Sequence, residues 1–68
     1  MPRDWRKRGM RLKRLREKRE WTQQELAEKV GVSRVTVARI EIGNRRPSLE
    51  LLERLAKALK VKVGELLK

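Results

Sequence analysis

Two arginines and two small apolar residues form the most chemically specific group in the chain. In a helix, Arg34, Val35, Ala38 and Arg39 lie on one side. An arginine guanidinium is a planar fork of donors that can bind two acceptors at once, and a valine side chain suits contact with a methyl group. A solvated helix face is the alternative, because proteins tolerate isolated exposed apolar residues such as Val35. The neighbouring sequence favours the first interpretation.

Capping signals predict that this group lies on the second of two short helices. Thr22 and Glu25 have the spacing of a capping box, in which each side chain accepts a hydrogen bond from the other residue's backbone N–H. Gly31 follows the last apolar residue of the first helix and suits the left-handed backbone that ends a helix. Ser33 then caps a second helix that runs to about Ile40. The sequence therefore predicts two helices joined by a sharp glycine turn.

The stretch TQQELAEKVGVSRVTVARIE, followed by IGNRRPS, resembles the Cro and phage-repressor-like helix-turn-helix family, also called the xenobiotic-response-element type. The resemblance extends from Leu12 to about Leu67. It implies an all-α, five-helix, lambda-repressor-like DNA-binding domain with the helix-turn-helix at helices 2 and 3. It also implies that helix 3 enters the major groove of double-stranded DNA while helix 2 lies across the backbone.

The resemblance further implies which residues contact DNA. The base-reading positions are matched by Arg34, Val35, Ala38 and Arg39. Contacts with the sugar-phosphate backbone, which carry no base information, are expected from Thr22, Gln23, Ser33, Asn44, Arg45 and Arg46. The alternative for the last two is that they are solvated arginines beside a loop.

Arg16 and Glu41 match positions that the family commonly pairs. A partly buried pair would fix the angle of the recognition helix more than it would add net stability, because desolvation offsets much of the Coulombic attraction. The alternative is that Arg16 is one exposed arginine among many.

Composition limits the remaining possibilities. The 68 residues suffice for one small domain, and 20 basic residues against nine acids give a net charge of +11. Such a charge suits nucleic acid or an anionic membrane surface. Without cysteine or histidine we expect no catalytic residue, no metal and no cofactor. No apolar run could span a membrane or serve as a signal peptide, so we expect a cytoplasmic, nucleoid-associated protein.

The positive charge is concentrated at the start of the chain, where residues 1 to 20 carry a net charge of +7. We assign residues 1–8 to a basic arm and residues 9–68 to the DNA-binding domain. Candidate DNA contacts in the arm are Arg3, Arg6, Lys7 and Arg8. The alternatives are a solvated tail, or a helix that starts early with Asp4 as its cap and Trp5 as an apolar contact.

Apolar residues near the C-terminus suggest a second chain. The helix that Ser48 caps has an apolar stripe from Leu49 to Leu59, and Leu51 falls outside it. A short final helix without a good cap follows. We expect these two helices to meet their symmetry mates in a homodimer through Leu51, Val63, Leu66 and Leu67. The alternative is that Leu66 closes the monomer core and that a dimer forms only on DNA.

Together these features predict a sequence-specific transcription regulator, expected to be a repressor that covers a pseudo-palindromic operator as a homodimer. No membrane partner and no small-molecule ligand is indicated. An antitoxin or a restriction-modification controller would have the same fold. A nonspecific architectural DNA-binding protein and a protein-interaction module are the alternatives from other classes.

Overall fold

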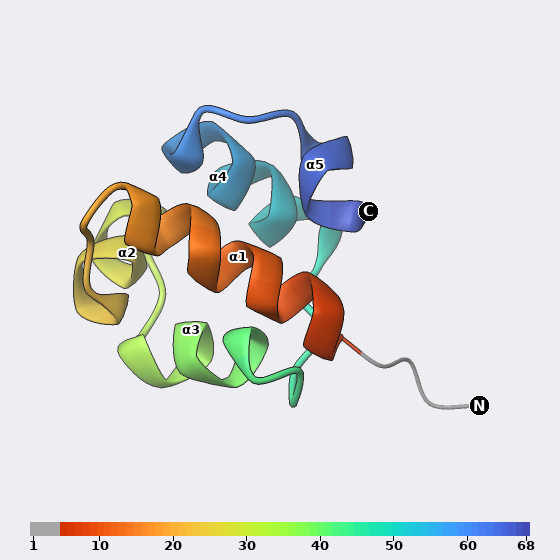
Figure 1. Ribbon diagram of the computed structural model, residues 1–68. Coiled ribbons are helices and arrows are strands. Elements are labelled where there is room, and N and C mark those ends of the chain that lie inside the picture. Colours follow the sequence, from red (N-terminus) through yellow and green to blue (C-terminus); the bar gives the residue numbers. More distant parts are fainter. Residues whose placement is uncertain (1–4) are drawn as a thin grey trace.

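The computed structural model describes residues 5–68, which form five helices and no strand (Figure 1). The helices are α1 (Arg6–Lys18), α2 (Gln23–Val30), α3 (Arg34–Glu41), α4 (Leu49–Leu59) and α5 (Val63–Leu67). The all-α, five-helix fold class expected from the sequence is confirmed.

Local side-chain caps set the boundaries of α2 and α3. Glu25 N donates to Thr22 Oγ1 at 3.0 Å and Thr22 N donates to Glu25 Oε1 at 2.7 Å, which completes the predicted capping box. Gly31, with φ of +76°, ends α2 in the left-handed conformation. Ser33 Oγ then accepts a hydrogen bond from Thr36 N at 3.2 Å and starts α3. The helix-turn-helix is therefore specified by residues within it.

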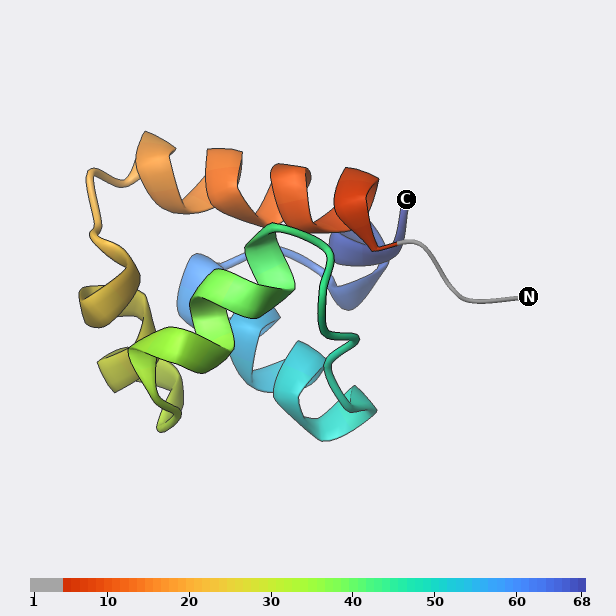
Figure 2. The ribbon, with the colours of Figure 1, turned by 90° about the horizontal axis from the view of Figure 1, so that it is seen from below.

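One core joins all five helices. Each helix contributes at least one side chain that is almost completely buried. Along the chain these include Leu12, Leu26, Val37, Leu55 and Leu66. Helix α1 packs against α3 and α5, and α2 packs against α3 and α4 (Figures 1 and 2). Helix α3 therefore lies at the edge of the core, with one face buried and the other exposed.

A glycine allows α1 to approach the end of α3 closely. A Cβ atom added at Gly9 would lie 2.2 Å from the carbonyl oxygen of Ile40 and 2.5 Å from that of Glu41. Both oxygens belong to the backbone, so neither could move aside easily. Gly9 therefore sets the distance between the two helices and helps to position α3.

The start of α1 corrects the predicted arm. Trp5 is only 2% exposed, and Arg6, Lys7 and Arg8 are helical. Arg8 Nε donates to the Leu67 carbonyl at 3.0 Å, and its guanidinium lies 5.5 Å from the centroid of the Trp5 ring. Residues 5–8, which the sequence assigned to the arm, are therefore part of the described fold, because burial of the indole extends the core. Arg3 lies outside the described residues.

Two residues assigned to the dimer contact belong to the core of a single chain. Leu51 is 8% exposed and Leu66 is 2% exposed. The apolar face of α4 is wider than one stripe, because α2 and α5 both pack against this helix. Leu51 and Leu66 therefore pack within one chain, which leaves them little surface for a subunit contact, whereas Leu67 is 39% exposed and Val63 is half-buried.

Candidate nucleic-acid interface

The outward face of α3 carries the residues that the sequence singled out. Arg34 and Arg39 are exposed, Val35 is 47% exposed, and Ala38 is half-buried between them. The opposite face of the helix is buried in the core. Figure 2 shows α3 lying across the surface of the domain with the loop that follows it alongside. The arginine side chains can therefore reach a partner that approaches this surface.

A buried ion pair holds the end of α3 against α1. Arg16 Nε donates to Glu41 Oε2 at 2.6 Å and Arg16 Nη2 donates to Glu41 Oε1 at 3.0 Å. Arg16 Nη1 also donates to the Trp21 carbonyl at 2.6 Å. The hydrogen bond to Glu41 raises the pKa of Arg16, and burial opposes this effect. The bidentate pair fixes the orientation of α3 because both helices must keep their positions to maintain it.

Gln23 connects the first residue of α2 to the same pair. Its Nε2 donates to Glu41 Oε1 at 3.0 Å, and the side chain is half-buried. An amide nitrogen has two N–H groups, so this hydrogen bond leaves one for an external acceptor. The N-terminal end of α2 also has unpaired backbone N–H groups and a partial positive charge. This helix end suits an anion such as phosphate.

The predicted backbone contacts Thr22 and Ser33 are used first as caps. Each hydroxyl oxygen accepts a backbone N–H, and both side chains are exposed. Ser33 Oγ also lies 3.0 Å from Thr36 Oγ1. A hydroxyl that accepts a hydrogen bond can still donate one, so capping does not prevent these residues from binding a phosphate.

The loop after α3 adds polar and basic side chains to the same surface. Asn44, Arg45 and Arg46 are exposed, and the Asn44 backbone N–H donates to the Arg39 carbonyl at 2.8 Å. This bond ties the loop to α3. The loop also exposes Ile42, at 65%, which the sequence analysis did not single out. The one feature of the sequence that could have pointed to Ile42 is its position directly after α3.

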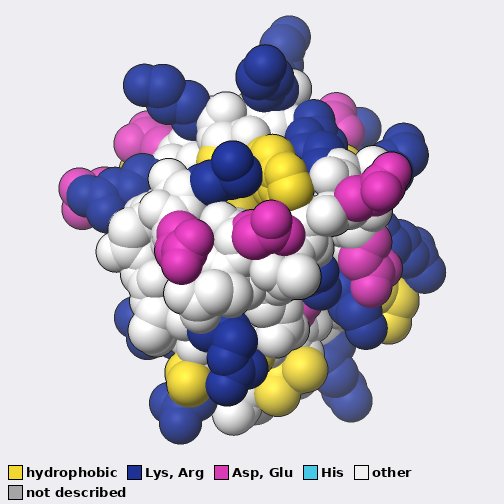
Figure 3. All heavy atoms as spheres, turned by 90° about the vertical axis from the view of Figure 1, so that its left-hand side faces the viewer, with side chains coloured by type: hydrophobic (Ala, Val, Ile, Leu, Met, Phe, Trp, Pro, Cys, Tyr) yellow, Lys and Arg dark blue, Asp and Glu magenta, His cyan; other side chains and the backbone are white. Residues whose placement is uncertain are grey.

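The surface around α3 has a one-sided charge. Between Gly31 and Leu49 the one acidic residue is Glu41, which is buried and paired, whereas Arg34, Arg39, Arg45 and Arg46 are exposed. Figure 3 shows the side of the molecule on which α2 lies, where acidic and basic side chains are mixed. At the lower edge of that view, on the side of α3, the coloured side chains are basic or hydrophobic. The surface of α3 is therefore suited to a polyanion.

Two further kinds of feature, a metal site and a membrane-spanning helix, are not found within residues 5–68. No group of three or more His, Cys, Asp or Glu side chains in this range could hold a metal ion. Across the same range, no helix combines the length and apolar character that a membrane crossing needs.

Two short capped helices joined by a left-handed glycine, with an exposed basic face on the second, define the helix-turn-helix class of DNA-binding domain. The chain belongs to this family: the family model described as "Helix-turn-helix" matches residues 12–66. The family resemblance predicted from the sequence is confirmed.

Known proteins with related sequences and structures include repressors and a controller. The chain is 45% identical over 56 residues to the immunity repressor protein of Bacillus phage phi105, which covers 82% of this chain and 39% of the repressor. It is similar in structure to the restriction-modification controller C.AhdI of Aeromonas hydrophila, with 37% identity and a TM-score of 0.88. The match covers 91% of this chain and 94% of the controller. It also resembles the P22 c2 repressor in a complex with a synthetic operator, with 36% identity and a TM-score of 0.87. The match covers 90% of this chain and 92% of the repressor chain.

Proposed function

We propose that this protein is a sequence-specific double-stranded DNA-binding transcription regulator that acts as a repressor in the cytoplasm. The observation that carries the proposal is the exposed face of α3, where two arginines flank Val35 and no acidic side chain between Gly31 and Leu49 is exposed. A bidentate ion pair and a close glycine contact hold this face in one orientation, which supports the proposal. The operator complex of the similar P22 c2 repressor supports the same proposal.

The proposed contacts divide into two groups. Arg34 and Arg39 each donate two parallel hydrogen bonds to O6 and N7 of a guanine, while Val35 and Ala38 contact thymine methyl groups. The second group contacts phosphates and sets the orientation of the domain on the duplex. It comprises Thr22, Gln23, Ser33, Asn44, Arg45 and Arg46.

Repression is proposed to occur by occlusion, with a homodimer covering a pseudo-palindromic operator. Two recognition helices about 34 Å apart would occupy successive major grooves on one side of the duplex. Since Leu51 and Leu66 are buried within one chain, the proposed subunit contact is reduced to Leu67 and the half-buried Val63. Because this apolar contact is small, we propose that the dimer assembles mainly on DNA.

A restriction-modification controller is the second candidate function. The observation that favours it is the similarity to C.AhdI over 94% of that chain. Such a controller would use the same α3 face, so the two candidates differ in the genes that the bound site regulates rather than in the interface.

Selection of DNA from a random pool, followed by protection of the selected site, tests the proposal. We expect an enriched motif with two symmetric half-sites, separated by about one helical turn of 10 to 10.5 base pairs. The matched control carries Arg34→Ala and Arg39→Ala and should select no motif. A wild-type protein that enriches no motif would overturn sequence-specific binding and leave a nonspecific architectural role.

A further inference from the structure

The outer face of α1 carries a row of basic residues that neither the core nor the α3 surface uses. Lys7, Arg11, Arg14 and Lys18 follow the i, i+4, i+7, i+11 spacing of a single helix stripe. All four side chains are exposed. At 1.5 Å per residue, the row extends for about 16 Å. It therefore presents a linear array of positive charge.

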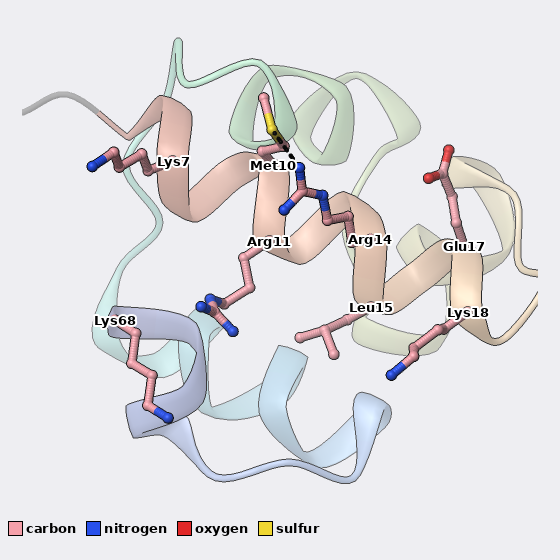
Figure 4. A pocket seen from close by; sticks show the side chains of 8 residues that line it. All are labelled: Lys7, Met10, Arg11, Arg14, Leu15, Glu17, Lys18 and Lys68. Carbon is pink, nitrogen blue, oxygen red and sulfur yellow. Dashed lines mark hydrogen bonds between the residues drawn. The ribbon is translucent and has the colours of Figure 1, made fainter.

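The row borders a groove of about 920 Å³ between α1 and the C-terminal Lys68 (Figure 4). Leu15 and the 50% exposed Met10 give the groove apolar surface, and Leu15 also packs against the core. Arg14 Nη2 lies 3.4 Å from Met10 Sδ. Figure 4 shows the side chains of Arg11, Leu15 and Lys18 extending from α1 toward the side of α4 and α5. The groove therefore combines apolar surface with a basic rim.

The charge of this groove is poorly neutralised within the described residues. Lys68 and the row on α1 supply five cations, whereas Glu17 is the one acidic residue of the lining. Within residues 5–68, Lys7, Arg11 and Lys18 form no ion pair. Lys68 Nζ lies 3.1 Å from Glu65 Oε2, in an exposed pair that solvent screens. Like charges in a row repel one another, so an acidic partner would relieve an unfavourable interaction.

We propose that this groove, called the α1 groove below, binds an acidic amphipathic helix of a partner protein. About three turns of such a helix match the length of the basic row, with Glu or Asp facing the cations. Leucine-like side chains on the same helix would cover Met10 and Leu15. Helix-in-groove recognition of this kind uses apolar anchors for affinity and charge for orientation.

Two other occupants fit the α1 groove less well. A second copy that docked through the same groove would place like charges against each other, because five of the lining residues are basic and one is acidic. A DNA backbone would satisfy the cations but offers little apolar surface to Met10. The residues that line the groove belong to α1 and the C-terminus, and none belongs to α3 or to the loop that follows it, so the partner and an operator would use different residues. The inference therefore does not depend on the proposed DNA contacts.

Fluorescence anisotropy with the full chain and no DNA tests the proposal. The probe is a fluorescein-labelled peptide of about 14 residues. Its leucines are spaced three or four residues apart, so that they lie on one face of a helix, and its other residues are glutamates. The groove variant carries Arg11→Glu and Lys18→Glu. The matched control carries Lys57→Glu and Lys62→Glu, which make the same change in net charge outside the groove. Circular dichroism shows whether each variant keeps its helices.

We expect the groove variant to raise the Kd of the peptide at least about tenfold, because two attractive contacts become repulsive. The control should change it less than about threefold, because charges farther than about 8 Å are screened at physiological ionic strength. Met10→Asn should weaken binding without any change in charge. It also provides a test if the charge-reversed protein fails to fold.

Three results would overturn the proposal. Equal losses in the groove and control variants would show that the peptide responds to net charge alone. Equal affinity for an all-glutamate peptide would show that the apolar surface makes no contribution. A groove variant that loses affinity for random duplex DNA but keeps its affinity for the peptide would assign the row to DNA binding instead.

Discussion

The two arginines of α3 differ from the other exposed basic residues in what surrounds them. Arg34 and Arg39 flank Val35 on a helix whose position is fixed, whereas Arg45 and Arg46 lie in a loop. A rigid helix can hold a side chain against one base, and a loop is better suited to phosphate contact. These two arginines should therefore determine sequence preference.

Replacing Arg34 or Arg39 with alanine tests this division of roles. Each change should cost roughly 1 to 3 kcal/mol at the selected site and relax one base position, because one bidentate contact is lost. Arg45→Ala serves as the control and should weaken cognate and random DNA alike. Titration of each variant against both duplexes measures the difference, and equal losses for Arg34→Ala on the two would reassign that residue to phosphate contact.

The Arg16–Glu41 pair makes a separate prediction for stability. Replacing Arg16 with methionine leaves the buried Glu41 carboxylate without its cation, with the hydrogen bond from Gln23 remaining, and should cost about 3 to 5 kcal/mol of unfolding free energy. The double variant Arg16→Met with Glu41→Leu should recover much of this loss, because no unpaired charge remains. Urea denaturation followed by circular dichroism measures both. A double variant as unstable as the single one would argue against the cost of an unpaired charge as the cause.

At the level of helices, the features that could be predicted from sequence are those set by neighbours in the chain. The capping box at Thr22, the left-handed Gly31 and the cap at Ser33 depend on residues within one turn, so their pattern is local. The early start of α1 and the burial of Leu51 depend instead on which helices pack against them. Periodicity describes one helix at a time and cannot show that α4 is covered on two sides.

The contact between α1 and α3 also depends on tertiary packing, and it makes its own prediction. Gly9→Ala should destabilise the protein by about 1 to 3 kcal/mol, because the added methyl group would meet the backbone carbonyls of Ile40 and Glu41. Gly64→Ala is the matched control, since a Cβ there has no neighbour within 4 Å. It should be neutral or should stabilise α5 by up to about 1 kcal/mol.

Thermal unfolding of the two glycine variants measures this effect, and operator titration shows whether α3 has moved. Gly9→Ala should also weaken operator binding by the molecules that remain folded, because the position of α3 would change. A Gly9→Ala protein as stable as the wild type would contradict the close packing of these helices.

At the scale of the whole molecule, assembly depends on a small apolar surface. Leu67 is exposed at the end of α5, and a large positive net charge opposes association of two free chains. The sequence could not decide whether Leu51 and Leu66 fill the core of one chain, because leucine suits a core and an interface equally. We therefore expect operator DNA to favour the proposed dimer, because its phosphates neutralise the positive charge of both subunits.

Leu67→Glu tests this account of assembly. A charge placed in the proposed contact should weaken cooperative binding to a two-half-site operator, because burial of an unpaired charge is unfavourable. Binding to a single half-site should change little. Lys60→Gln is a control, because it also lowers the net charge by one, and sedimentation with and without operator DNA measures the assembly. Unchanged cooperativity in Leu67→Glu would place the subunit contact elsewhere.

The central claim is that the α3 face reads a DNA sequence, and a competition titration tests it most directly. A labelled duplex selected by the protein is displaced by the same unlabelled duplex or by random DNA, at one fixed salt concentration because phosphate contacts depend on salt. If the α3 face reads sequence, the selected duplex should compete at least about 10³-fold better than random DNA. Equal competition by the two duplexes would contradict this claim.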